Sequence, residues 1–348
     1  MRLIDKRIFQ VVRRFGQVGG METYAYHLSE CLAERGHRVT VICEEYVHEC
    51  PGVDVIELPS APRSRRRWRA MMQFNDALDQ FFSRNASAAS CLIHSHERTR
   101  WHSVSTFHGP PMSVRRWYQF PSRRIRTWQY LEHREVAKDN VRRVVPVSSV
   151  LRAQLVGKYP EFTDRFSRPI NPGVSGISPA RYFETLSRGR LKLLFVGREW
   201  RRKGLPIAVE VCDALNRLGV TASLDVYGTD HCDVSKKLSR NSAVTFFGWQ
   251  PNVVFSDYDV LLHPAKSEPF GMVIAEALQS GCRAVISDAC GAVDLKHEGC
   301  SILEVNAPVS KWVRNVLEIC DAQPDWKPIQ TWSEVARQYE EVYIPLTV

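Results

Sequence analysis

The sequence predicts two α/β domains, each built on a doubly wound parallel sheet, that face each other across a cleft. The 348-residue chain is long for one hydrophobic core and fits two domains of ordinary size. In both halves, short β-branched runs alternate with helical patterns, as in parallel sheets covered on both faces. Glycine and proline concentrate in residues 171–190, where the alternation stops and restarts. We therefore expect one domain at residues 1–170, a second at 171–327, and a C-terminal helix at 328–348 that packs back on the first.

Local patterns place the elements in order along the chain. In the first half, apolar β-branched runs predict six strands, at residues 8–12, 39–43, 53–58, 91–95, 103–108 and 144–148. Apolar residues at helical spacing predict helices at 22–35, which Gly36 ends, and at 68–82. The second half predicts six more strands, at 191–196, 222–227, 244–247, 260–262, 284–286 and 301–303. Its helices are expected at 205–218, 273–280, 309–320 and 332–343.

The composition is that of a soluble globular protein, with 44% hydrophobic and 24% charged residues. No uncharged apolar run approaches the roughly 20 residues that a membrane-spanning helix needs. The first seven residues are too charged for a signal peptide, so we expect a cytoplasmic protein. The ten cysteines are scattered, with none in a Cys-x-x-Cys pair, and we expect them to be reduced.

The positive charge is concentrated in the first half. Residues 1–170 carry 28 Lys and Arg against 17 Asp and Glu, whereas residues 171–348 carry 19 against 21. This asymmetry predicts an anionic partner for the first half, either a membrane surface or a nucleic acid.

The most specific segment is residues 263–281, HPAKSEPFGMVIAEALQSG. A loop follows a predicted strand there and leads into a helix, whose first N–H groups, from Gly271, Met272 and Val273, would form a natural seat for phosphate. Glu268 precedes this helix and Glu276 lies about one turn inside it. One carboxylate could then face a transferred sugar while the other faces a ribose. The alternative is a solvated helix with ordinary surface glutamates.

This segment resembles the glutamate-bracketed motif of glycosyltransferase family 4, the retaining transferases of the GT-B fold. The resemblance covers nearly the whole chain, and it extends to transferases of the lipopolysaccharide core and other lipid acceptors. It implies that Glu268 contacts the donor sugar and that Glu276 contacts the nucleotide ribose.

Two cations follow a predicted strand end in Phe195-Val196-Gly197-Arg198 and Arg201-Arg202-Lys203-Gly204. Arg198 as a fork and Lys203 as a compact charge can clamp a diphosphate, and they act where negative charge develops on a leaving group. The pattern is similar to the donor-diphosphate site of the family, which gives that role to Arg198 and Lys203. Solvated loop cations are the alternative.

Two segments of the first half match the family in order. Gly19 and Gly20 stand between the first strand and the first helix, where the backbone can approach a ligand closely. The Gly-x-Gly-x-x-Gly fingerprint is absent, which counts against an NAD enzyme. His108 in Ser105-Thr-Phe-His-Gly109 follows a strand, at the sheet edge where such folds bind ligands. From composition alone a structural histidine would be favoured, whereas the family motif implies contact with sugar or acceptor.

Neighbouring histidines and two departures from the family pattern complete the motif analysis. His94, His96 and His102 lie near His108 but lack a convergent metal spacing, so no metal is expected. Where the family commonly has Gly-Gly and a glutamate, residues 290–294 read CGAVD. Residues 171–175 read NPGVS, in place of the family's Asn-Gly-Val-Asp.

Two stretches, residues 63–69 and 115–131, mix arginine with aromatic side chains. Such a surface suits an anionic membrane, with the aromatics at the headgroup boundary, or a phosphorylated acceptor. The same composition could bind RNA, and a solvated basic face is the plain alternative. The residues assigned to this surface are Arg65, Arg66, Arg67, Trp68, Arg115, Arg116, Trp117, Arg123, Arg124 and Arg126.

The sequence and the resemblance together predict a transferase that moves a hexose-type sugar from a nucleotide sugar to an acceptor hydroxyl, and the resemblance implies that it does so with retention. The expected context is lipopolysaccharide or other cell-envelope glycan synthesis at the inner face of the membrane. A UDP-sugar is favoured over a GDP-sugar; the acceptor would be a glycan or glycolipid, and no nucleic acid is expected. A nucleotide-sugar epimerase of similar fold, or a basic nucleic-acid-binding protein, are the alternatives. Catalytic roles are expected for His108, Glu268, Arg198 and Lys203, and donor contacts for Gly19, Gly20, Arg198, Lys203, Glu268, Phe270, Gly271, Met272, Val273 and Glu276.

Overall fold

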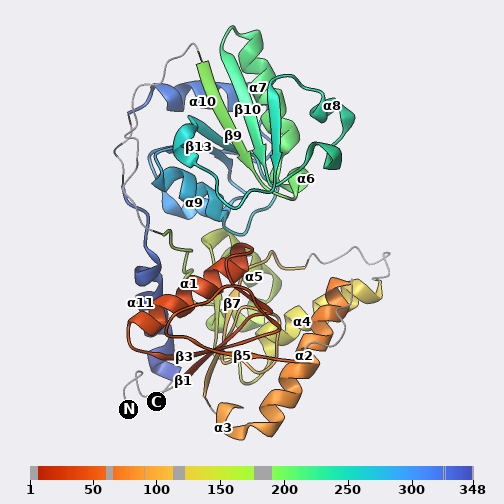
Figure 1. Cartoon of the computed structure of the whole chain (residues 1–348), viewed down its shortest axis with the longest axis vertical. Coiled ribbons are helices and arrows are strands. Elements are labelled where there is room, and N and C mark those ends of the chain that lie inside the picture. The colour runs from red at the N-terminus through yellow and green to blue at the C-terminus, as the bar shows by residue number, and fades with distance from the viewer. Residues whose placement is uncertain are drawn as a thin grey trace. The chain divides into compact units, whose positions relative to one another are not determined.

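The computed structural model describes residues 7–59, 66–89, 91–112, 122–175, 190–323, 325 and 327–346. The chain divides into two compact units, the first formed by Met1–Gly173 with Gln330–Val348 and the second by Val174–Ile329. Each unit contains a six-stranded parallel sheet with helices packed against it (Figure 1). The predicted fold class, two Rossmann-like α/β domains, is therefore confirmed.

The first unit has the strand order β5-β3-β1-β6-β7-β8, and β6 and β7 are buried at every residue. Its strands are β1 (Arg7–Val11), β3 (Arg38–Cys43), β5 (Asp54–Glu57), β6 (Leu92–Ser95), β7 (Val104–Phe107) and β8 (Arg143–Pro146), with a separate small pair β2 (Arg14–Phe15) and β4 (Glu45–Tyr46). Its helices are α1 (Gly20–Glu34), α2 (Arg67–Arg84), α3 (Ala86–Ala89), α4 (Arg123–Ala137), α5 (Ser149–Lys158) and α11 (Trp332–Tyr343).

The second unit repeats this topology with the strand order β11-β10-β9-β12-β13-β14. Its strands are β9 (Arg190–Val196), β10 (Thr221–Tyr227), β11 (Val244–Gly248), β12 (Val260–His263), β13 (Arg283–Ser287) and β14 (Cys300–Leu303). Its helices are α6 (Trp200–Lys203), α7 (Leu205–Arg217), α8 (Lys236–Ser239), α9 (Met272–Gln279) and α10 (Val309–Asp321). In each unit the first strand lies in the middle of the sheet, and the chain order reverses beside it.

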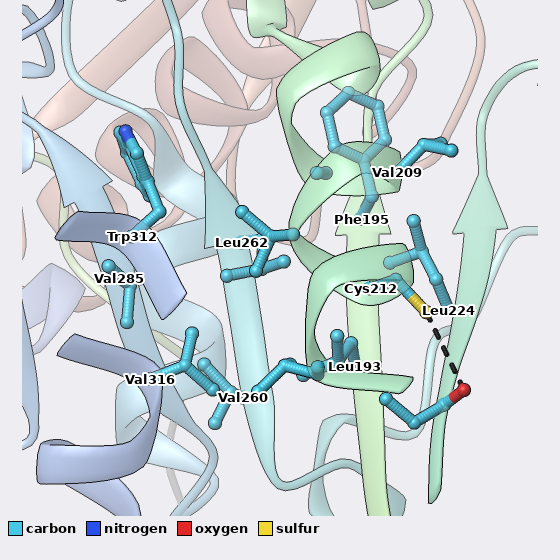
Figure 2. Packing of buried hydrophobic residues seen from close by; sticks show 14 of the residues in the cluster. Leu193, Phe195, Val209, Cys212, Leu224, Val260, Leu262, Val285, Trp312 and Val316 are labelled. Atoms are coloured by element: carbon cyan, nitrogen blue, oxygen red, sulfur yellow. Dashed lines mark hydrogen bonds between the residues drawn. The ribbon is translucent and has the colours of Figure 1, made fainter. Parts of the chain in front are cut away.

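The core of the second unit lies between its sheet and the helices α7 and α10. Figure 2 shows Leu193 and Phe195 of β9 beside Leu262 of β12, with the helices contributing Cys212 and Trp312. All five side chains are fully buried. The ten cysteines all lie in the described residues and are free, so the thiols that fall in this core act as small apolar groups.

Helix α11 returns to the first unit after the whole second unit. The hydroxyl of Thr331 accepts from the backbone N–H of Glu334, whose carboxylate accepts from the Thr331 N–H, which forms a capping box. Trp332 packs edge-on against Tyr24 of α1 with ring centroids 5.2 Å apart. Near the other end of α11, Glu340 accepts a hydrogen bond of 2.6 Å from Arg35. These contacts hold the last helix against the first one.

The sequence did not predict α4, because the buried face of this helix is partly charged. It buries Glu132, Arg134 and Glu135 beside apolar side chains, and these charges hide the apolar periodicity. Glu132 is satisfied inside the unit by Lys158 and by Arg98, whose guanidinium lies 3.0 Å away. A charged side chain can be buried at such a position because it is paired.

We expect Leu262→Ala to lower the free energy of unfolding by about 2–5 kcal/mol, because it removes a fully buried side chain and leaves a cavity in the core of the second unit. Urea denaturation followed by circular dichroism measures the loss. Leu218→Ala, at a position 66% exposed, is the matched control and should change stability by less than about 0.5 kcal/mol. Equal losses in the two variants would contradict the assigned core.

Candidate functional site

The strand order of the second unit points to the carboxyl ends of β9 and β12 as the edge where a ligand would bind. These strands are neighbours, and the chain order of the sheet reverses between them. Open α/β sheets bind ligands outside the carboxyl ends of the strands at such a point. Arg198 follows β9, and the loop with Glu268 follows β12 at His263. The sequence motifs of the second half therefore converge on one edge of the sheet.

Glu268 is the centre of a cluster at this edge. Its Oε2 lies 3.0 Å from Lys203 Nζ, 3.3 Å from His263 Nε2 and 3.4 Å from an Arg202 guanidinium nitrogen. The Glu268 side chain is 10% exposed, and His263 is fully buried. Three donors thus surround one oxygen of a largely buried carboxylate, which holds the side chain in a single orientation.

The cluster keeps Glu268 ionised. Burial by itself would raise the pKa of Glu268, but the hydrogen bond from His263 and the charge of Lys203 lower it far below its ordinary value. Burial lowers the pKa of His263, so the ring is neutral at neutral pH and donates from Nε2. Glu276 differs, since burial raises the pKa of its carboxyl and the charge of Lys203 lowers it only in part. Lys203 therefore acts electrostatically on both glutamates.

A glycine allows Lys203 to reach Glu268. A Cβ at Gly197 would overlap the Cδ of Lys203, so only glycine leaves room for this side chain to cross the end of β9. The turn is held by Thr229, whose hydroxyl donates to the Gly197 carbonyl over 2.6 Å. Arg198, the next residue, is exposed and forms no ion pair within the described residues.

The loop that carries Glu268 is fixed by the segment after β13. Glu268 N–H donates to the carbonyl of Ala289, and its own carbonyl accepts from Gly291 N–H. Phe270 is buried, and its carbonyl accepts from Ala292. The CGAVD segment, which departs from the family pattern, therefore supports the Glu268 loop through backbone bonds.

Helix α9 begins directly after this loop. Gly271 adopts φ 95°, a left-handed conformation that favours glycine, and leads into Met272 and Val273 at the first turn. Glu276 lies one turn later on the same helix. Glu268 thus lies in the loop, the predicted phosphate-binding N–H groups lie at the start of α9, and Glu276 lies inside α9.

The predicted residues of the first unit lie at the ends of its strands and helices. Gly19 is the extended N-cap of α1, and a Cβ there would lie 2.5 Å from the Glu22 carboxylate. Gly20 is the first residue of α1. His108 follows β7, its Nε2 lies 3.0 Å from His96 Nδ1, and its ring is half-buried. His108 is therefore hydrogen-bonded to the buried His96 on one side and partly exposed on the other.

The other histidines near His108 are engaged in hydrogen bonds. His94 contacts Thr106, and His102 lies between the Thr99 hydroxyl and the Glu135 carbonyl. Within the described residues, no three His, Cys, Asp or Glu side chains are grouped so as to hold a metal ion.

The basic surface lies where α2 begins and along α4. Arg66, Arg67 and Trp68 line a hollow of about 660 Å³ together with Arg124 and Trp128. Arg123 and Arg126 are exposed on α4, whereas Arg65, Arg115, Arg116 and Trp117 lie outside the described residues. None of the described helices has the length and apolar character needed to cross a bilayer.

Sequence reasoning missed two members of the Glu268 cluster. The sequence assigns no role to His263, which begins the segment of residues 263–281, and it assigns the diphosphate to Arg198 and Lys203 and not to Arg202. A signal for His263 exists, because it is a polar residue at the carboxyl end of an otherwise apolar strand, five residues before Glu268. Arg202 gives no such signal among its adjacent cations.

Comparison with known proteins bears on both halves. The model described as Glycosyltransferase Family 4 matches residues 18–175, and the model described as Glycosyl transferases group 1 matches residues 181–329. The chain belongs to the GT-B glycosyltransferases. The Glu268 cluster lies within the part matched by the group 1 model, and His108 lies within the part matched by the family 4 model.

A curated relative of this chain is the lipopolysaccharide glucosyltransferase WaaG of Escherichia coli, which is 29% identical over 157 residues; the match covers 43% of this chain. The chain spans about two fifths of the length of the curated relatives it matches, 40% and 41%.

Solved structures share the fold over nearly the whole chain. Sucrose-phosphate synthase from Thermosynechococcus elongatus has a TM-score of 0.75 at 19% identity, covering 98% of this chain and 99% of that one. Anabaena Alr3699/HepE in complex with UDP and glucose has a TM-score of 0.68 at 16% identity, covering 98% and 100%.

We expect Lys203→Met to lower the free energy of unfolding at pH 7 by about 1–3 kcal/mol, between the values for exposed and fully buried pairs. The lowered pKa of Glu268 contributes stability at pH values above its ordinary carboxyl pKa of 4.5, and this contribution is lost as the pH falls through the folded-state pKa. The difference between wild type and variant should therefore shrink on acidification. Urea denaturation across the acidic range measures it, with Lys266→Met, an exposed lysine of the same loop, as control. A difference that does not vary with pH would refute the role of the ion pair.

Proposed function

We propose that this protein transfers a hexose-type sugar from a UDP-sugar to an acceptor hydroxyl with retention, in the synthesis of lipopolysaccharide or another cell-envelope glycan. The Glu268 cluster at the strand-order reversal of the second unit is the observation that carries the proposal. The two matched family models and the likeness to WaaG support it. An ordinary surface glutamate would not be buried beside two cations and a neutral histidine.

The donor would be bound by residues with distinct charges. Arg198 and Lys203 bind the diphosphate, while Glu276 accepts hydrogen bonds from the ribose hydroxyls. Glu268, held ionised, accepts from hydroxyls of the sugar. The N–H groups at the start of α9 add positive potential beside the diphosphate. The likeness to Alr3699/HepE, solved with UDP and glucose, supports a uridine nucleotide as the donor.

The proposed transfer breaks the bond between the anomeric carbon and the diphosphate oxygen and forms one to the acceptor oxygen on the same face. The acceptor proton moves to the departing diphosphate oxygen, so no protein base is needed. Arg198 and Lys203 stabilise the charge that develops on the leaving group. Glu268 and His108 favour positive character at the anomeric carbon, and no metal is assigned a role.

The acceptor side is proposed for the basic surface of the first unit. Its arginines on α2 and α4 surround a hollow with Trp68 and Trp128, which suits a phosphorylated glycolipid or the headgroups of an anionic membrane. Docking of this kind would place the protein peripherally at the cytoplasmic face of the membrane.

A thermal-shift comparison of UDP-, GDP- and ADP-sugars tests donor binding. A UDP-sugar should raise the melting temperature, because ligand that binds only the folded state stabilises it. Incubation with the same donor and candidate acceptors should then release a glycosylated product. An isomerised sugar without glycosylation would instead favour the epimerase alternative, and no stabilisation by any nucleotide sugar would count against the proposal.

Two variants separate binding from turnover. Glu276→Ala should weaken donor binding by about 10–100-fold, the loss expected for a charge-assisted hydrogen bond. Lys203→Ala should lower kcat by about 100-fold, because it removes a cation that acts on developing charge. Calorimetry and initial rates measure the two effects. Glu210→Ala, an exposed glutamate of α7, is the control and should behave as wild type; wild-type behaviour of all three would refute the assignments.

Membrane docking predicts that Arg124→Glu weakens binding to vesicles containing phosphatidylserine. Each basic residue near an anionic surface contributes about 1 kcal/mol, so charge reversal should reduce partitioning roughly tenfold or more. Co-sedimentation at low and high salt measures the effect. Arg84→Glu, an exposed arginine at the other end of α2, is the matched control. An equal loss in both variants would indicate a net-charge effect and not a docking surface.

A further inference from the structure

A continuous chain of hydrogen bonds leads from His108 into the core of the first unit. His108 Nε2 lies 3.0 Å from His96 Nδ1, and His96 Nε2 lies 2.9 Å from Gln10 Oε1. On the other side of the same amide, Gln10 Nε2 lies 3.3 Å from Tyr343 Oη. His96 follows β6, Gln10 lies on β1 and Tyr343 ends α11. Three elements far apart in sequence therefore supply the first links.

The chain continues from Tyr343 through the middle of the sheet. Tyr343 Oη lies 2.6 Å from His94 Nδ1, and His94 Nε2 lies 2.7 Å from Thr106 Oγ1. Thr106 Oγ1 lies 2.5 Å from Tyr339 Oη, which lies 3.1 Å from Tyr24 Oη. All five side chains are fully buried, so solvent does not compete for these bonds.

Tyr24 is the donor at the far end of the network. Its hydroxyl donates toward the Tyr339 hydroxyl, 3.1 Å away, and toward the carbonyl oxygen of Ile170, 3.3 Å away. The carbonyl oxygen can only accept, so both bonds use the hydrogen of Tyr24.

The Gln10 amide sets the direction of the bonds on the His108 side. Its Nε2 donates to the Tyr343 hydroxyl, so the amide nitrogen faces Tyr343 and the amide oxygen faces His96. An amide oxygen can only accept, and an amide nitrogen can only donate.

The last links decide the state of His108. The Gln10 oxygen faces His96, so His96 donates from Nε2 and accepts at Nδ1. His108 must then donate to His96 from Nε2, which leaves the lone pair on Nδ1. Among the described residues, His108 Nδ1 has no hydrogen-bonding partner.

The directions given above require one hydrogen on the imidazole rings of His96 and His108, so both must be neutral. Burial lowers the pKa of His94 and His96 well below the ordinary value, and neighbouring histidines lower it further. Burial also lowers the pKa of His108 to about 3. At neutral pH each ring therefore has one donor nitrogen and one acceptor nitrogen.

We propose that this chain of hydrogen bonds fixes His108 in the Nε2–H tautomer, so that its Nδ1 accepts a hydrogen bond from a hydroxyl of the sugar substrate. Only the identity of the ligand rests on the proposed function; the tautomer does not. His96, Gln10 and Tyr343 are positioning residues, which act on the ligand through His108. The C-terminal helix thus helps to set the hydrogen-bonding state of a residue that follows β7.

The tautomer can be measured directly on the full chain. Two-bond proton–nitrogen correlation spectra of histidine-labelled protein at neutral pH should show His96 and His108 as single Nε2–H tautomers. His96→Gln and His108→Gln assign the resonances. Addition of a UDP-sugar should shift the Nδ1 resonance of His108. A His108 ring that carries its hydrogen on Nδ1, or that is protonated, would overturn the proposal.

Tyr343→Phe interrupts the chain of hydrogen bonds and leaves the His96–His108 hydrogen bond in place. The Gln10 amide is then free to turn, so His108 should populate both tautomers and its two nitrogen resonances should move toward each other. If half of the molecules carry the hydrogen on Nδ1, donor affinity falls about twofold. Tyr130→Phe, an exposed tyrosine of α4, is the control and should leave both readouts unchanged. Unchanged His108 resonances in folded Tyr343→Phe would refute the positioning role.

The outcomes separate this proposal from the proposed function. Nε2–H resonances that do not respond to any nucleotide sugar would support the fixed tautomer and refute a sugar hydroxyl as its ligand. If the protein binds the donor while His108 carries its hydrogen on Nδ1, the proposed transferase function stands. The proposal that the hydrogen-bond chain fixes the His108 tautomer is then refuted.

Discussion

Lys203 reaches Glu268 across the end of β9, in the space that only a glycine at position 197 leaves open. The rest of the second unit's site depends on this contact. Burial raises the pKa of Glu268, and the hydrogen bond from His263 with the charges of Lys203 and Arg202 lowers it far below its ordinary value. Lys203 also lowers the pKa of Glu276, which burial nevertheless raises. The parallel sheet supplies the geometry, because it ends β9 and β12 side by side.

The two units have the same strand order and use the corresponding sheet edge differently. In the second unit, charged side chains meet at the carboxyl ends of the strands, and their ion pairs fix the site. In the first unit, the ion pair of Arg13 and Glu44 lies at this edge, but the network behind His108 consists of neutral imidazoles, hydroxyls and an amide. The arrangement of that network is set by which atom holds each hydrogen, whereas the Glu268 cluster is set by charge.

The sequence predicted all twelve strands of the two large sheets, because most positions in these strands are apolar. It missed α4, where Glu132 and Arg134 occupy buried positions and break the apolar periodicity. In the site, Glu268 and Lys203 were found from a motif, but their direct pairing was not, since it depends on how two loops meet. The roles of His96 and Gln10 could not be predicted from the sequence for a related reason. Their importance comes from hydrogen-bond partners more than 80 residues away, which no local pattern encodes.

Helix α11 completes the first unit although it follows the entire second unit in the chain. The second unit is in this sense an insertion, interrupting the first between Gly173 and Gln330. During synthesis, which proceeds from the N-terminus, residues 1–173 emerge without the helix that covers Tyr24 and His94. The first unit must therefore remain incomplete, with buried polar groups uncovered, until the second has been made. This order delays the assembly of the His108 environment until helix α11 has been made, after the whole second unit.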